Sequence, residues 1–349
     1  MKNAVESKAR RPQVPARPTA SFAAGTPGRL TEWGFRLIQE ACAAFGRSFH
    51  LADPETAGSG DLVLTTAPDK AFRRAAEGTT PILFLGDPLS DFAYQQQIAI
   101  QPQSQTLRSV SASASMIRDA ARPGAVLVRE RGASAHAAIA QVLRAFGFSL
   151  SDPAAAALVE RFAGARDMPL AKAIERFPAG TSGGVVPPLD DITAGLVAKT
   201  IAPIFQATSK PEKIIWPRVI FFNGDRPGEP ALPWVEVAGG ARILYYGPYL
   251  HLPRGRWNVS STLCFSDDLE STVFSIEVVW GTRPLGRGRV RPQRAGTFYA
   301  AFDVDVPSGA EAIEVRISTD QGSIFGRMAL IEVAFQPAEA ISPPAEPPS

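Results

Sequence analysis

The spacing of hydrophobic residues changes near residue 213, and this change divides the chain into two predicted parts. In the first part, residues spaced by three and four around Thr31, a residue type that caps helices, predict a helix with one apolar face: Leu30, Trp33, Leu37, Ile38, Ala41 and Phe45. Short apolar runs predict strands buried on both faces, at 49–52, 61–66, 81–85 and 125–129. Helices are predicted between and after them, at 70–77, 107–121 and 133–146. This alternation predicts a small Rossmann-like α/β domain at 29–165.

The second part alternates apolar and polar residues with a period of two. Phe298, Phe302 and Val304, for example, alternate with Tyr299 and Asp303. Strands are predicted on this basis at 242–246, 256–265, 273–280, 287–291, 297–306, 311–318 and 326–335. Short antiparallel strands in this number are typical of a two-sheet β-sandwich, here at 214–336. The fold class is therefore α/β plus all-β, joined by a helical connector at 166–213.

The two ends of the chain differ from both parts in composition. Residues 1–28 are basic and rich in proline and alanine, and residues 337–349 consist mainly of proline, alanine and glutamate. Such segments bury too little apolar surface to offset the entropy of ordering them. We therefore expect a disordered basic tail at 1–28 and a second disordered tail at 337–349.

Composition and charge exclude several classes of protein. The net charge of +2 over 349 residues argues against nucleic acid as a partner, because nucleic-acid binding generally needs a strongly basic face. Cys42 and Cys264 fall in different predicted domains, which argues against a disulfide framework or a cysteine metal site. No apolar run reaches the roughly 18 residues of a membrane span, and no apolar stretch follows the first basic residues. The expected location is cytoplasmic.

Loops that follow the strands of an α/β domain are where a ligand is expected. The loop 86–91 carries Asp87 and Asp91, which could coordinate a cation or orient a sugar hydroxyl in a sugar-transferring enzyme. Equally, Asp87 followed by Pro88 is typical of a helix start. The chain has no GxGxxG or GxxxxGK[ST] motif, and neither His50 nor His136 lies near a nucleophile motif. We expect no cofactor and no metal.

In the sandwich, the stretch 241–257 predicts a strand, a rigid turn and a second strand. Gly247-Pro248 is expected to end the first strand, because proline has no amide hydrogen to donate, so that a loop at 247–255 carries Tyr249 and His251. Aromatic residues in and near this stretch could stack on sugar rings, namely Tyr246, Tyr249, Trp234 and Trp257. Polar partners for the hydroxyl groups are available in Arg242, Asp225, Asn223 and His251. The alternative is that Trp257 and Trp280, which lie inside strands, belong to the core.

A row of arginines forms a second candidate surface. Arg287, Arg289 and Arg291 fall on one face of a predicted strand, where they could meet an anionic glycan or a membrane surface. The alternative is that they pair with acidic residues of neighbouring strands. Both interpretations place them on an exposed face.

Part of the second half resembles a known class of module. WPRVIFFNGDRPGEPA, ILYYGPYLHLPRGRWNVSSTLCFS and GRMALIEVAF resemble the jelly-roll modules of bacterial glycan-related proteins, in which a Gly-Pro-Tyr and a Leu-Pro-x-Gly turn precede a strand bearing an aromatic residue. The resemblance covers about 216–336 and implies a sandwich and a role near polysaccharide, with no catalytic residue. Three functions stay open: a non-catalytic protein that binds glycan or a protein partner through its sandwich, a divergent sugar-transferring enzyme, and a structural interaction module.

Overall fold

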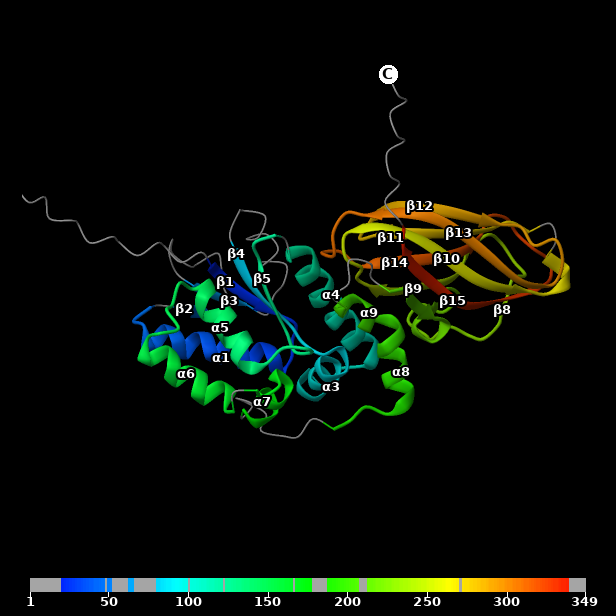
Figure 1. Cartoon of the computed structure of the whole chain (residues 1–349). Coiled ribbons are helices and arrows are strands. Elements are labelled where there is room, and N and C mark those ends of the chain that lie inside the picture. The colour runs from blue at the N-terminus through cyan, green and yellow to red at the C-terminus, as the bar shows by residue number, and fades with distance from the viewer. Residues whose placement is uncertain are drawn as a thin grey trace, which may run out of the picture.

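The computed structural model describes residues 20–47, 49–51, 62–65, 80–99, 101–121, 123–165, 167–177, 187–206, 212–269 and 272–338. The predicted helix at 70–77 and most of both predicted tails lie outside the described residues. The chain forms two halves side by side, a helix-covered parallel sheet and a pair of antiparallel sheets (Figure 1). None of the helices in the described part combines the length and apolar character that a membrane crossing requires.

The parallel sheet has the strand order β2-β3-β1-β4-β5. Its strands are β1 (Ala20–Gly25), β2 (Phe49–Leu51), β3 (Leu62–Thr65), β4 (Thr80–Leu85) and β5 (Val126–Arg129). All its pairings are parallel, which confirms the α/β part of the predicted fold. The order differs from the 3-2-1-4-5 order of dinucleotide-binding sheets in the exchange of β2 and β3.

The central strand β1 corrects the prediction of a disordered tail at 1–28. Ala20–Gly25 pairs with β3 on one side and β4 on the other. Phe22, Ala23 and Ala24 are at most 1% exposed. The sequence ASFAAG has no β-branched residue and no alternation, since both faces of a central strand are covered, so neither propensity nor period identifies it.

Helices cover both faces of this sheet. One face carries α1 (Arg29–Ala44), α5 (Ala135–Ala145), α6 (Pro153–Ala163) and α7 (Leu170–Arg176), and the other carries α3 (Pro88–Ala99) and α4 (Gln103–Ala120). Thr31 does not cap α1 as predicted, because the helix begins two residues earlier, after Gly28. The Thr31 hydroxyl donates instead to the carbonyl oxygen of Thr26, at 2.5 Å.

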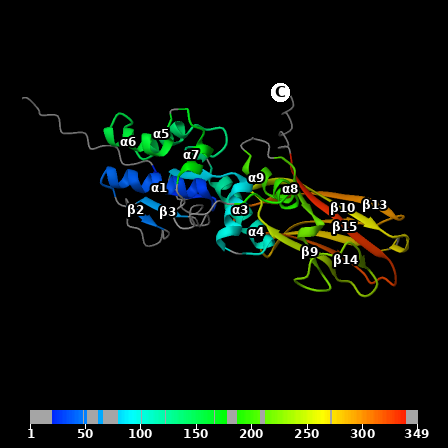
Figure 2. The ribbon, with the colours of Figure 1, turned by 90° about the horizontal axis from the view of Figure 1, so that it is seen from below.

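The segment predicted as a connector divides between the two halves. Its first helix, α7, packs with α1 and α5, whereas α8 (Asp191–Thr200) and α9 (Ala202–Phe205) lie between the parallel sheet and the antiparallel sheets (Figure 2). One apolar cluster runs from Leu83 of β4 through Leu107 of α4 and Ile201 to Trp216 and Val259 of the antiparallel sheets. The two halves therefore share a hydrophobic core.

The antiparallel half consists of two sheets, as predicted. One has the order β13-β10-β15-β6, with β8 also paired to β15: β6 (Ile214–Pro217), β8 (Val235–Glu236), β10 (Gly255–Phe265), β13 (Gly296–Val306) and β15 (Arg327–Pro337). The other has the order β12-β11-β14-β9-β7: β7 (Phe222–Asn223), β9 (Ile243–Leu250), β11 (Phe274–Trp280), β12 (Arg283–Val290) and β14 (Ile313–Thr319). Short 3-10 turns lie at Arg218–Ile220 and Asp267–Leu269.

Strand β9 corrects the predicted break at Gly247-Pro248. The strand continues to Leu250, and Pro248 stands opposite Glu314 of β14. The register of the pairing between β9 and β14 shifts between Ile313 and Glu314. The residue of β9 left without a partner is Tyr249, and the pairing of β9 with β7 ends at Tyr246, so Pro248 lies beside a bulge on a part of the strand with one free edge, where proline is tolerated.

Candidate functional site

Asp87 lies at the carboxyl edge of the parallel sheet, where it caps a helix. Its Oδ1 accepts the amide hydrogens of Leu89 and Ser90 at 3.1 Å each, in the first turn of α3. Its other oxygen forms an ion pair with Arg131. The helix-start interpretation of Asp87 is therefore the one that the structure supports.

Asp91 is fully buried beneath the same edge. Its Oδ2 accepts the Thr26 hydroxyl at 2.5 Å, and its carboxyl group fills the space where Gly28 and Gly86 would each carry a Cβ, 1.8 and 2.4 Å from Oδ1. Burial raises the pKa of Asp91 well above its usual range, against the lowering effect of the Thr26 hydrogen bond. The predicted acidic ligand site is wrong for Asp91, because the carboxyl group is enclosed by the protein.

The predicted sugar platform is in part present, at the edge of the sheet that contains β9. Tyr246 and Tyr249 lie 6.3 Å apart between ring centroids, and Phe222 of β7 lies 5.4 Å from Tyr246. The guanidinium carbon of Arg108, from α4, stands 5.0 Å from the Tyr249 centroid and 5.4 Å from that of Phe222. We call these four residues the aromatic cluster. Arg108 covers one face of Tyr249, so that face is closed to a ligand.

Tyr249 is held in place from several sides. It has a φ of 67°, in the left-handed region, although it is not glycine. Its hydroxyl donates to Oε1 of Glu314 at 3.0 Å, and Glu314 in turn accepts from Arg316 at 2.6 Å. Burial and the neighbouring Glu314 raise the pKa of Tyr249 to about 12. Tyr249 is thus a fixed, neutral side chain of the strand and not the loop residue that was predicted.

Arg242 belongs to a structural clamp. It binds Asp225 through two hydrogen bonds, of 2.5 and 3.2 Å, and donates to the backbone oxygens of Glu236, Val237, Ala238 and Gly240. Asn223 is 3% exposed, and its side chain accepts the amide hydrogen of Asp225 at 2.9 Å. These predicted polar partners fix the loops around residues 223–242, which leaves few free donors for a ligand.

His251 and Trp257 point into the molecule. The His251 ring hydrogen-bonds to the carbonyl oxygen of Gly309 at 2.7 Å, and burial lowers its pKa. Trp257 is 2% exposed and donates its indole N–H to the carbonyl oxygen of Pro253 at 3.1 Å. Trp257 is therefore a core residue, which corrects its place among the ligand-binding candidates, and the His251 ring is engaged within the fold.

Two other predicted features are exposed but do not join the aromatic cluster. Trp234 is 47% exposed. Arg287 and Arg289 lie 3.8 and 3.2 Å from the carboxylate of Asp320, and Arg291 is exposed at the end of the same row. Arg287 and Arg289 therefore follow the alternative interpretation of the arginine row, in which the arginines pair with acidic residues of neighbouring strands.

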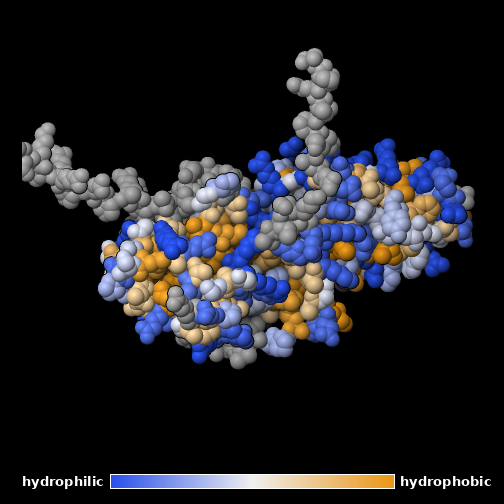
Figure 3. Space-filling model, viewed as in Figure 1, coloured by the Kyte–Doolittle hydropathy of each residue, from blue (hydrophilic) through white to orange (hydrophobic). Residues whose placement is uncertain are grey.

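A groove opens beside the aromatic cluster, between α4, α8 and the segment that joins β6 to β7. Its volume is about 710 Å³, and Phe222 forms part of its wall. The other lining residues include Leu107, Leu196, Val219 and Pro230, together with the polar Gln103, Ser104, Asp191 and Lys199. We call it the α8 groove. In Figure 3, apolar surface is visible near α8, where Ile192 is 85% exposed.

Sequence reasoning did not find the α8 groove. Its residues come from 103–107, 191–199 and 217–230, three segments that meet only because α4 and α8 pack against the antiparallel sheets. One signal was available, the glycine inside α8. A Cβ at Gly195 would meet nothing within 4 Å, so this turn of the helix faces open space.

No family model and no curated protein matches the chain. Among solved structures it is similar to the CBM36-1 domain of a multidomain xylanase from the hindgut metagenome of Trinervitermes trinervoides, at 12% identity, covering 37% of this chain and 100% of that chain with a TM-score of 0.27. It is also similar to the C-terminal CBM6 of a marine laminarinase from Zobellia galactanivorans, at 11% identity, 36% and 99% coverage and a TM-score of 0.25. A CBM35 from Cellvibrio japonicus Abf62 matches at 12% identity, 36% and 92% coverage and a TM-score of 0.25. These neighbours are carbohydrate-binding module domains, which agrees with the resemblance of residues 216–336 to jelly-roll modules of bacterial glycan-related proteins.

Proposed function

We propose that the protein is a non-catalytic saccharide-binding protein and that the α8 groove is its binding site. The observation that supports this is the groove of about 710 Å³ whose wall contains the partly buried Phe222, close to Tyr246 and Tyr249. Pyranose rings present apolar C–H faces that pack against aromatic rings. An aromatic wall in an open groove is thus suited to a sugar.

The polar groups of the groove complement hydroxyl groups. Gln103 and Ser104 at the start of α4, and Asp191 and Lys199 on α8, supply both donors and acceptors. Asp191 is the one carboxylate among the lining residues that the structure describes. Hydrolysis of a glycosidic bond generally uses two carboxyl groups, so this set favours binding over cleavage.

The test removes the aromatic wall and, separately, fills the groove. Binding of oligosaccharides is measured on a glycan array, and the strongest ligand is followed by calorimetry. Phe222→Ala should weaken binding by roughly 2- to 10-fold, on the scale of an aromatic contact. Gly195→Trp should abolish it, because the open space at this position lets the indole occupy the groove without moving the helix.

Two matched variants separate the groove from general effects. Gly195→Ala changes the same position but adds one methyl group and favours the helix, so binding should persist. Tyr299→Ala removes an aromatic ring that is 74% exposed on the other sheet, and it should bind as the unchanged protein does. Equal binding by Gly195→Trp and Gly195→Ala would exclude the groove as the site.

A further inference from the structure

A second cavity lies at the carboxyl edge of the parallel sheet. It shares the helix α8 with the α8 groove, since Ala194 lines this cavity and Gly195 lines the groove, but no residue lines both. Its volume is about 380 Å³. Four of its lining residues come shortly after three different strands of the sheet. Arg29 begins the helix after β1, Leu89 and Ser90 lie in the first turn of the helix after β4, and Glu130 directly follows β5. The carboxyl edge is where open α/β sheets place their ligands. We call this space the sheet-edge cavity.

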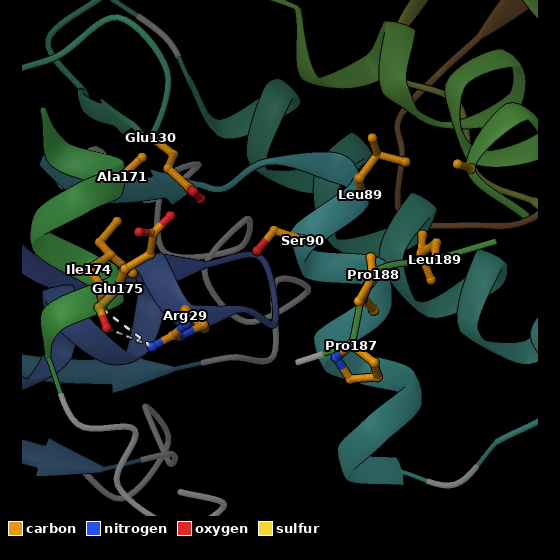
Figure 4. A pocket seen from close by; sticks show the side chains of 12 residues that line it. Arg29, Leu89, Ser90, Glu130, Ala171, Ile174, Glu175, Pro187, Pro188 and Leu189 are labelled. Carbon is orange, nitrogen blue, oxygen red and sulfur yellow. Dashed lines mark hydrogen bonds between the residues drawn. The ribbon is translucent and has the colours of Figure 1, made fainter. Parts of the chain in front are cut away.

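Three charged residues line this cavity: Glu130, Arg29 and Glu175, of which Glu175 is more exposed and pairs with Lys172 at 2.8 Å. Glu130 points into it from the end of β5, and Arg29 lies across it at the start of α1 (Figure 4). The two are close enough for the charge of Arg29 to lower the pKa of Glu130, although burial, the largest effect, raises that pKa. The cavity therefore offers an anionic pole and a cationic pole.

Each pole keeps hydrogen-bonding capacity. Glu130 accepts one amide hydrogen, from Asp87, through Oε2 at 3.1 Å. Arg29 uses Nη2 for long contacts of 3.5 and 3.4 Å to the backbone oxygens of Ile174 and Glu175. Within the described residues, no hydrogen bond occupies Nη1 or Nε of Arg29. Ser90 adds a hydroxyl group that points toward the cavity (Figure 4).

The remaining wall is largely apolar. Leu89, Ile174, Leu189 and the paired prolines Pro187 and Pro188 line it. At about 380 Å³ the cavity lies at the lower end of the range for small-molecule sites. A ligand that fits must be small and must combine a carboxylate, an ammonium group and an apolar part.

We propose that the sheet-edge cavity binds a free α-amino acid with an apolar side chain. Its carboxylate lies against the Arg29 guanidinium, which pairs with carboxylates in a planar fork. Its ammonium group donates to Glu130 and to the Ser90 hydroxyl, and its side chain packs against Leu89 and Leu189. This site is independent of the saccharide site proposed above.

The test measures the melting temperature and the heat of binding with three related probes. L-leucine should raise the melting temperature by on the order of a few degrees at saturating concentration. N-acetyl-L-leucine lacks the ammonium group and L-leucinamide lacks the carboxylate, so neither should do so. L-valine and L-phenylalanine extend the test to smaller and larger side chains.

Variants then locate the response. Glu130→Gln keeps an acceptor for the Asp87 amide hydrogen but removes the anionic pole, and it should weaken L-leucine binding at least tenfold. Phe222→Ala removes part of the α8 groove wall and no residue near the sheet-edge cavity, so it should leave the response intact, and failure of one proposal is distinguishable from failure of the other. The proposal is overturned if none of the three amino acids binds, if N-acetyl-L-leucine binds as well as L-leucine, or if Glu130→Gln binds L-leucine unchanged.

Discussion

Arg108 of α4 lies over the ring of Tyr249 and joins the two halves of the molecule. Its guanidinium carbon is 5.0 Å from the ring centroid, and its Nε donates to the carbonyl oxygen of Pro248 at 3.0 Å. Two other residues on the same helix make polar contacts with the sandwich: Ser111 accepts the amide hydrogen of His251, and Asp119 accepts those of Arg254 and Gly309. The helix α4 is thus bound to the antiparallel sheets along its length.

We expect Arg108→Ala to lower the free energy of unfolding by about 1–3 kcal/mol. The loss combines two cation–π contacts with a hydrogen bond from a charged donor. Arg108→Lys keeps the charge but not the planar fork, so it should lose part of that amount. Urea denaturation followed by fluorescence measures both. Arg327→Ala, at an arginine whose side chain is 63% exposed, is the control that should change little.

The burial of each strand and the size of its apolar residues explain which strands the sequence could predict. The strands β10, β13 and β14 alternate clearly because one face of each is solvated, as Phe298 and Val304 show against the exposed Tyr299 and Asp303. The strand β1 is covered on both faces and gave no such signal. The buried strand β4 was still predicted, because TPILFL contains a run of large apolar residues, whereas ASFAAG of β1 consists mostly of small ones. A fully buried strand is therefore identified from sequence only where its apolar residues are large.

The candidate site was less predictable for a related reason. Tyr246 and Tyr249 were identified because their segment is distinctive, but their neighbour Arg108 lies about 140 positions earlier in the chain. Trp257 and His251 share that distinctive segment, yet they face the interior. Which side a residue faces depended on a strand that passes through Pro248, a feature set by the register with β14 and not by the local sequence.

Replacements at Tyr249 should separate the stabilisation by its aromatic ring from the strain of its backbone conformation. Tyr249→Ala and Tyr249→Gly both remove the ring and its hydrogen bond to Glu314. At a φ of 67°, glycine is unstrained whereas alanine is not, so Tyr249→Gly should be more stable than Tyr249→Ala by about 1 kcal/mol. Thermal or urea unfolding measures the difference. A Tyr249→Ala protein that is the more stable of the two would show that this backbone conformation does not persist in solution.

Asp91 should make the stability of the protein depend on pH. Burial raises its pKa in the folded protein, and the negative charges of Glu130 and Asp87 raise it further. Folding therefore takes up a proton at Asp91 between its unfolded pKa of about 3.9 and the raised value, and stability falls as pH rises through this window, by up to about 1.4 kcal/mol per pH unit. Asp91→Asn places a neutral amide in the same space beside Thr26 and should remove this part of the slope. Urea unfolding from pH 4.5 to 8 measures the slope of stability against pH. Asp305→Asn, at an exposed position, is the control. Identical slopes for Asp91→Asn and the unchanged protein would mean that Asp91 is ionised in the folded protein.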